Sequence, residues 1–254
     1  GKIKKMKNLQ LRLILVICLT GIIGVGYGQQ NPVMSHYLVN PYLYNTASVG
    51  QNGTALNMHY RKQWVDMPDA PDTKIFTAQG LFKDKFGLGA KVYMDKAHII
   101  QNYAMKISYA YYVRTRKDPD NHYLSIGVSA GFKHQRLNFE EANIENSLDP
   151  NIFFNGASKS VFDADAGINY FVKGFRIGAS VANLAPNTYN FSSNSSNLEF
   201  KPVYHVYGNA AYDIKFGKAK DIKLQPSILV RYIPEIPVQF DANLLLDIKN
   251  VFWL

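Results

Sequence analysis

The sequence is short of cysteine and of long apolar runs, and each shortage excludes a class of protein. Its one cysteine, Cys18, lies within the apolar run Leu13 to Val25, so the chain beyond that run has no thiol, disulfide or cysteine metal ligand. The run is shorter than the roughly 20 residues of a spanning helix. A mean hydropathy of −0.17 also argues against a helical membrane protein. A membrane barrel, which hides its apolar residues at alternate positions, is still allowed.

The N-terminus has the order of a secretory signal. Lys7 and Arg12 precede the apolar run, and small residues ending at Gly28 follow it. We therefore expect residues 6–28 to be a signal peptide cleaved near Gly28. Residues 1–5 precede the first methionine and are interpreted as translated upstream sequence. An uncleaved N-terminal anchor helix is the alternative, which the shortness of the run disfavours.

The net charge is also small once this leader is set aside. The whole chain carries a formal net charge of +9, and five of its 28 basic residues but none of its 19 acids precede position 29. The remaining 23 basic residues exceed the 19 acids by four. Such a balance is an ordinary surface charge and predicts no nucleic-acid partner.

Alternation of apolar with small or polar residues is abundant. Within the segment His122 to Arg136, apolar residues fill the even positions from 124 to 132, and small or polar residues fill the odd positions from 125 to 133. The chain is also rich in aromatics, with 17 tyrosines. Repeated alternation between turns is typical of an antiparallel transmembrane β-barrel of the outer membrane, whose apolar face meets lipid and whose other face meets the lumen.

About ten such segments follow residue 50. The expected strands are 54–64, 73–82, 86–95, 101–114, 122–136, 161–172, 175–184, 203–216, 222–233 and 238–248, and an eleventh begins at Val251. The links after the first, fifth and seventh strands are long and several others are short, as expected of extracellular loops and periplasmic turns. A soluble β-sandwich is the alternative, but its strands usually run about 3–10 residues.

Residues 29–50 precede the strands and read differently. Asn-Pro steps interrupt any strand there, while tyrosines and leucines supply apolar bulk. We expect this lead-in segment to pack inside the barrel or along its periplasmic rim rather than to form a disordered tail. Residues 51–254 are then the barrel. A four-residue eleventh strand cannot cross an apolar band of ~25 Å, so we expect C-terminal strands to be missing and the sequence to be a fragment.

No catalytic motif is apparent. The six histidines are scattered, no pair has metal-ligand spacing, and no Gly-x-Ser-x-Gly elbow occurs. Asp163, Asp165, His205 and Asp241 lie mid-strand on the non-apolar face, where we expect lumenal polar residues. The two neighbouring aspartates form an acid pair or an ion site or, more commonly in such a place, contact a lumenal Lys or Arg. Glycines at the start of the third strand are interpreted as bends or bulges.

The landmarks of the chain resemble those of the PorP/SprF proteins of the type IX secretion system. The most specific is Arg61-Lys62-Gln63-Trp64 followed by Ala70-Pro71. Weaker landmarks follow the same order: Asn31-Pro32, Ser35-His36-Tyr37, Asn40-Pro41, Gly87-Leu88-Gly89, Asp95-Lys96, Ser108-Tyr109-Ala110-Tyr111 and Asp165-Ala166-Gly167-Ile168. The resemblance covers the whole chain beyond the leader, although Thr46 follows Asn45 where the family usually has proline.

The resemblance implies a non-enzymatic protein of the cell outer membrane in Bacteroidota-type bacteria, without cofactor or metal, that serves protein secretion and gliding motility. Its implied partners are outer-membrane lipid and either periplasmic secretion components, among them a peptidoglycan-binding protein and a lipoprotein, or the C-terminal domain of a secreted adhesin. An outer-membrane porin or small-solute channel is the alternative. Arg61, Lys62, Gln63 and Trp64 are candidate partner or rim contacts, or else interface anchors of the kind any barrel needs.

Overall fold

The computed structural model describes residues 37–67, 70–115, 122–138, 157–185, 187–192, 197–216, 222–248 and 252–253. All of these belong to one compact unit, Pro32–Leu254. The expected upstream residues 1–5, the signal peptide 6–28 and the first part of the lead-in, residues 29–36, lie outside the described residues.

The alternating segments form antiparallel strands, and most of these pair in one sheet in the order β1-β2-β3-β4-β5-β6-β7-β10-β12-β13-β14. Two further strands, β8 and β9, pair only with each other, and β11 pairs with β12. The bounds are β1 Ala55–Lys62, β2 Asp72–Phe82, β3 Phe86–Ala97, β4 Ile100–Arg114, β5 His122–Leu137, β6 Ala157–Val172, β7 Phe175–Ala182, β8 Tyr189–Ser192, β9 Asn197–Phe200, β10 His205–Tyr212, β11 Ile214–Phe216, β12 Ile222–Ile233, β13 Ile236–Ile248 and β14 Phe252–Trp253.

The main sheet exposes its apolar face and buries its polar one. On β4, Met105 and Ile107 are 57% and 66% exposed, whereas Lys106 and Ser108 beside them are 5% and 1% exposed. A soluble protein would bury the apolar face, so this inversion suits lipid outside and a polar interior. Exposed aromatics stand near both ends of the outward face: Tyr60, Tyr103 and Tyr232 at one end, and Tyr111, Tyr170, Phe175 and Tyr212 at the other.

Most strand bounds lie within two residues of the expected ones, but β6 begins at residue 157 and not at 161. Three further places differ more in kind. The link after β7, expected to be a loop, contains the β8–β9 hairpin. The expected strand 203–216 breaks at Asp213, whose backbone N–H donates to Gly174 and whose carboxylate accepts from Gln225 at 2.5 Å. The expected strand 54–64 ends at Lys62, because Trp64 has a φ of 49° in a turn closed by a hydrogen bond from Met67.

Successive links alternate between the two ends of the sheet, because neighbouring strands are antiparallel. Links 63–71, 138–156 and 183–204 all fall where β1, β5 and β7 finish, which we call the long-link end. The opposite, short-turn end carries tight links such as 83–85 and 173–174. Two short links, 98–99 and 234–235, also lie at the long-link end, so only the long links are confined to one end.

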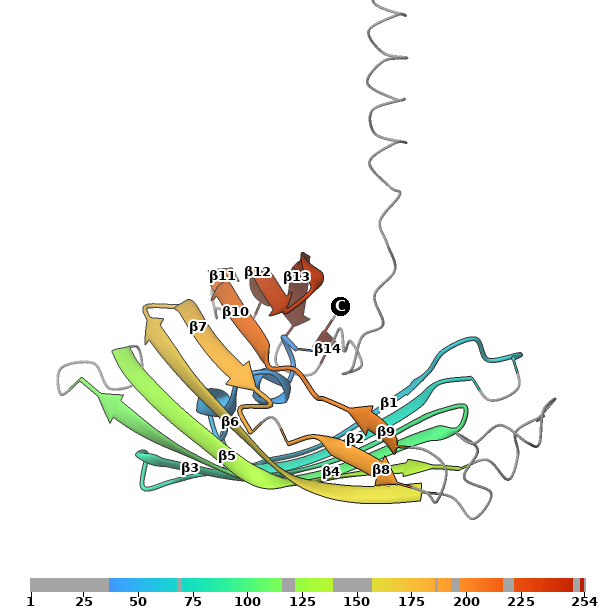
Figure 1. The fold of residues 1–254 in the computed structure, drawn as a ribbon. Helices are drawn as coiled ribbons and strands as arrows, with labels where there is room; N and C mark the ends of the chain where they lie inside the picture. Colours follow the sequence, from blue (N-terminus) through green and yellow to red (C-terminus); the bar gives the residue numbers. More distant parts are fainter. Residues whose placement is uncertain are drawn as a thin grey trace, which may run out of the picture. The chain divides into compact units, whose positions relative to one another are not determined.

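Residues 37–53 contain no strand and are called here the plug segment. They form two 3-10 turns, η1 (Pro41–Leu43) and η2 (Thr46–Ser48). Pro41 opens η1 with a preset φ, and the Asn45 side chain caps η2 by accepting from the Ala47 N–H at 2.9 Å. The segment lies against the concave, polar face of the curved sheet, where it is drawn in blue in Figure 1.

The main sheet is curved but not closed. Its first strand, β1, does not pair with β13 or β14 at the other edge, so the described residues form an open barrel. The plug segment contacts both edges from the inside, as detailed below. No helix among the described residues is long and apolar enough to cross a membrane.

Candidate functional site

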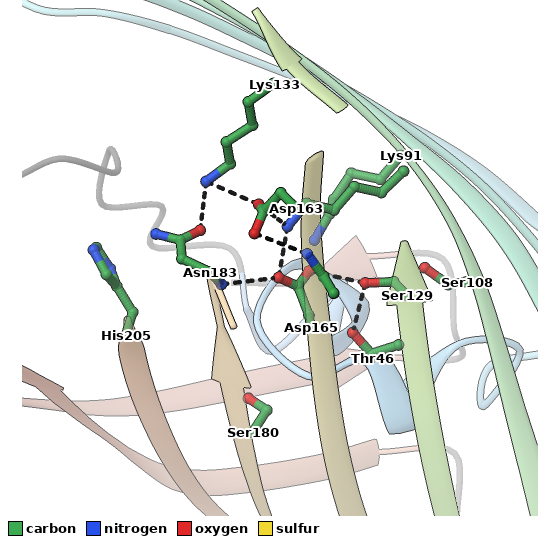
Figure 2. A network of polar contacts seen from close by, with 12 residues as sticks. Thr46, Lys91, Ser108, Ser129, Lys133, Asp163, Asp165, Ser180, Asn183 and His205 are labelled. Atoms are coloured by element: carbon green, nitrogen blue, oxygen red, sulfur yellow. Dashed lines mark hydrogen bonds and ion pairs between the residues drawn. The ribbon is translucent and has the colours of Figure 1, made fainter. Parts of the chain in front are cut away.

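A cluster of buried charges occupies the middle of the polar face. Lys106 on β4 places its Nζ 2.6 Å from Asp163 Oδ2 and 2.5 Å from Asp165 Oδ1, both on β6. Lys133 on β5 adds a third ion pair, 3.0 Å from Asp163 Oδ2. Figure 2 shows Lys133, Asp163 and Asp165 converging from neighbouring strands. The side chains of Lys106 and of both aspartates are at most 6% exposed, so water screens these pairs very little.

Neutral groups complete the bonding of the cluster. Ser129 donates to Asp165 Oδ2 at 2.9 Å, and the backbone N–H of Asn183 donates to Asp165 Oδ1 at 3.2 Å. Lys133 also donates to the Asn183 side chain. Because Asn183 begins the link that carries the β8–β9 hairpin, the cluster ties that link to β5 and β6 (Figure 2).

The cluster also holds the plug segment. The hydroxyls of Ser129 and Thr46 are 3.5 Å apart. Lys91 on β3 donates to the Leu43 carbonyl at 3.4 Å and lies 5.5 Å from the centre of the Tyr42 ring, within cation–π range. The cluster of three lysines and two aspartates thus makes ion pairs between strands of the sheet and also contacts the plug. It therefore fixes the plug to the sheet.

Glycines on the polar face let the plug backbone approach the wall. A Cβ on Gly127 would lie 2.6 Å from the Cα of Ala47, and one on Gly167 would lie 2.2 Å from Asn45 Oδ1. On β3, a Cβ at Gly87 or Gly89 would meet Val49 at 2.1 Å or 2.4 Å. The expectation of a bulge at the start of β3 is wrong, because β3 pairs with β2 in unbroken register. These glycines make room for the plug.

Tyr42 anchors the plug by its hydroxyl. Its OH donates to Ser108 at 2.6 Å, and burial raises the pKa of the phenol to about 12. The folded protein therefore holds this proton more tightly than the unfolded chain does. The stability that follows is complete below pH 10, the ordinary pKa, and is lost as the pH rises through about 12.

We expect Tyr42→Phe to lower the free energy of unfolding by about 1 kcal/mol at neutral pH, the net value of a typical hydrogen bond. The variant should also lose less stability than the wild type between pH 8 and pH 11, since it has no phenol to ionise there. Urea unfolding in detergent, followed by far-UV circular dichroism at both pH values, measures both effects. An equal alkaline loss in the two proteins would contradict the assignment.

The residues expected in the lumen lie on the polar face but do not all meet. Asp163 and Asp165 are in the cluster, where Lys106 and Lys133 are their basic partners. His205 on β10 is fully buried, with Nδ1 3.2 Å from the Tyr207 hydroxyl. Asp241 on β13 pairs instead with Arg231 on β12, at 2.8 Å.

The rim residues expected from the sequence lie at and beyond the end of β1, whereas the cluster lies on β4, β5 and β6. Arg61 and Lys62 end β1, and Gln63 and Trp64 form the turn beyond it, at the long-link end. The Gln63 N–H donates to Pro71, which closes the base of this link. Trp64 is 66% exposed, and its neighbours Val65 and Met67 are also exposed. The described structure therefore separates this rim from the lumenal charges.

The β8–β9 hairpin covers the interior at the long-link end. Its Tyr189 and Phe191 are 6% and 3% exposed and pack with Leu137 of β5 and Val161 of β6. An isolated two-stranded hairpin is marginal in water, so these aromatic contacts hold it in place. Asn187 adds a hydrogen bond to the Phe162 carbonyl at 2.9 Å.

The chemistry available here is binding and support. Among the described residues, no group of three His, Cys, Asp or Glu side chains is placed to hold a metal ion. The buried aspartates pair with Lys106 and Lys133, and the cluster positions the plug and the hairpin. The cluster is thus a structural centre of the interior.

The fold defines the class of the protein before any comparison: an antiparallel sheet, apolar outside and polar inside, is that of a membrane β-barrel. Residues 26–254 match the family described as type IX secretion system membrane protein PorP/SprF. The chain therefore belongs to the PorP/SprF family and is a membrane component of the type IX secretion system. This is a secretion-system family, not a known enzyme family. Neither the curated proteins nor the solved structures yield a match.

Proposed function

We propose that this protein is a sealed, non-enzymatic platform of the type IX machinery in the outer membrane. In this role it binds periplasmic components of the machine, or it aids the export and surface attachment of a secreted adhesin. The observation that carries the proposal is that the plug occupies the interior towards the short-turn end and the β8–β9 hairpin covers it at the long-link end. A filled interior suits a protein that binds partners at its rims better than one that passes solutes.

Strand β5 shows how the filling is layered. From the short-turn end, Ser125 donates to the Ala47 carbonyl of the plug, and Ser129 meets both the plug and Asp165. Lys133 then pairs with Asp163, and Leu137 packs under the β8–β9 hairpin. At about 3.3 Å per residue, these four inward positions span much of the membrane thickness. Plug, charged cluster and hairpin thus follow one another along the same line.

The two ends suit different partners. Outer-membrane barrels carry long loops outside the cell and short turns in the periplasm. In that orientation, Arg61 to Trp64 face the exterior, together with the exposed apolar tip of Val65 and Met67. This supports the rim as a contact for a surface partner such as an adhesin C-terminal domain. A peptidoglycan-binding protein or a lipoprotein would meet the short-turn end.

Affinity purification of the tagged, membrane-embedded protein tests this division. We expect the double variant Trp64→Ala/Met67→Ala to lose capture of a secreted adhesin and to keep capture of periplasmic components. Lys173→Ala, an exposed change at the short-turn end, is the matched control and should keep the adhesin. Recovery of neither class of partner by the wild type would sink the proposal, and equal loss in both variants would sink the assignment to the rim.

Planar-bilayer recording separates the platform from the alternative, a porin or small-solute channel. We expect the wild-type protein to give no steady conductance, because the plug and the hairpin obstruct the interior in series. A porin would conduct steadily in the same assay. Stable open-channel currents from the wild type would therefore favour the channel and count against a sealed platform.

A further inference from the structure

We infer that the plug segment, residues 37–53, is an internal template on which the sheet assembles and by which β1 and β13, at the two edges of the described sheet, are brought together. This inference goes beyond the proposed function and does not depend on which partner the protein binds. It rests on where the plug makes its hydrogen bonds, on the glycines that receive it, and on the order in which its contacts can form.

The plug is bonded to nearly every strand of the main sheet. Its hydrogen-bond partners lie on nine strands: His59 on β1, Thr77 on β2, Lys91 on β3, Ser108 on β4, Ser125 on β5, Asn169 on β6, Ser180 on β7, Ser227 on β12 and Asn243 on β13. Each bond is directional, so together they fix the position of every one of these strands around one short segment. A plug that merely filled space would not need a set of hydrogen bonds to so many strands.

Two plug residues join the edges that backbone pairing leaves apart. The Asn40 side chain donates to Thr77 at 2.9 Å and lies 3.3 Å from the His59 ring, at the β1 edge. The Tyr37 hydroxyl lies 3.0 Å from both the Ser227 hydroxyl and the Asn243 amide, at the β13 edge. The Cα atoms of Tyr37 and Asn40 are at most ~11 Å apart, so a short stretch of the plug contacts both edges.

The glycine contacts show that the plug's fit to β3, β5 and β6 is close and specific. The approaches at Gly87 and Gly127 involve plug backbone. The approach at Gly167 involves the side-chain oxygen of Asn45, which the Ala47 N–H holds in place as the cap of η2. A wall residue with a Cβ would exclude the plug at each point. We call this surface, formed by Gly87, Gly89, Gly127 and Gly167, the glycine seat.

Sequence separation sets the order of the contacts. Asn40 and Thr77 are 37 residues apart, whereas Tyr37 and Asn243 are 206 apart. Closing the shorter loop costs less entropy and happens sooner. The plug therefore seats on the early strands first. It then presents Tyr37, Leu38 and Tyr44 as a ready surface for Tyr207 and Leu229 of the late strands.

The order of burial during refolding tests the template directly. In the full chain with Cys18→Ser, a single cysteine replaces either Ser48 of the plug, which is 2% exposed, or Leu229 of β12, which is 1% exposed. Each protein is diluted from urea into detergent and pulsed with maleimide. We expect the cysteine at position 48 to become protected several-fold faster than the one at position 229. Equal or reversed rates overturn the inference.

A plug supplied from outside gives a second, independent test. Ala47 is fully buried against Gly127, so Ala47→Arg ejects the plug of the full chain and leaves the glycine seat intact. We expect about tenfold slower formation of protease-resistant sheet, because the plug contacts form before the sheet is complete. A synthetic peptide of residues 37–53 should restore the rate, and the same peptide with Ala47→Arg should not. Wild-type refolding of the variant, or failure of the wild-type peptide to rescue it, overturns the inference.

Discussion

Lys106→Met should lower the free energy of unfolding by about 3–5 kcal/mol, the usual cost of removing one partner from a buried ion pair. The variant keeps Asp163 and Asp165 in a site where their side chains are 3% and 5% exposed. Lys133 still faces Asp163, but Asp165 keeps only Ser129 and the Asn183 N–H as hydrogen-bond donors. Among the described residues, Asp165 then has no ion pair in a dry interior. Its charge is poorly compensated, so the loss should be large.

Urea unfolding in detergent micelles, followed by far-UV circular dichroism, measures this loss. Lys159→Met, on the exposed beginning of β6, is the matched control and should change stability by no more than about 0.5 kcal/mol. Adding Asp165→Asn to Lys106→Met should recover much of the loss, because the uncompensated charge is then gone. If Lys106→Met behaves like Lys159→Met, the cluster does not support the fold.

The strands were predictable because one physical rule governs them all. Lipid outside and a polar interior impose a period of two, and this period placed the bounds of β2 to β7, β12 and β13 within four residues. The β8–β9 hairpin was not predicted because it is not part of the main sheet and packs against the interior. Its Tyr189 and Phe191 pack against Leu137 and Val161, which are distant in sequence. The break at Asp213 escaped because it depends on Gly174 and Gln225, which are contacts of the folded chain.

Only the aspartates of the candidate site were predictable from the sequence. Mid-strand aspartates on the polar face mark a site by themselves, and Asp163 and Asp165 are indeed in the cluster. Their lysine partners cannot be identified from the sequence until the register of the strands is known. Lys106 stands opposite Gly131, which stands opposite Asp163, so a residue without a side chain lies between the two charges. A lysine on one strand and a glycine at the same level on the next is a signal that a register prediction would expose.

The glycine seat leads to the prediction with the clearest control. Gly127→Ala should lower the free energy of unfolding by about 1–3 kcal/mol, the usual cost of overpacking. The new Cβ would lie 2.6 Å from both the Cα and the N of Ala47, so plug backbone must move. Without that contact, the same change would stabilise by about 0.4–1 kcal/mol through the unfolded chain. The sign of the effect therefore reports whether the plug is seated.

Gly208→Ala supplies the comparison, because a Cβ there meets nothing within 4 Å and its φ is not positive. It should be neutral or slightly stabilising, as a glycine replaced without strain usually is. Chymotrypsin gives a second readout, since Tyr37 and Tyr42 are 5% and 1% exposed when the plug is seated. Cleavage within the plug should rise in Gly127→Ala and stay at the wild-type level in Gly208→Ala. Because both changes add one methyl group to a strand glycine, only contact with the plug can separate them.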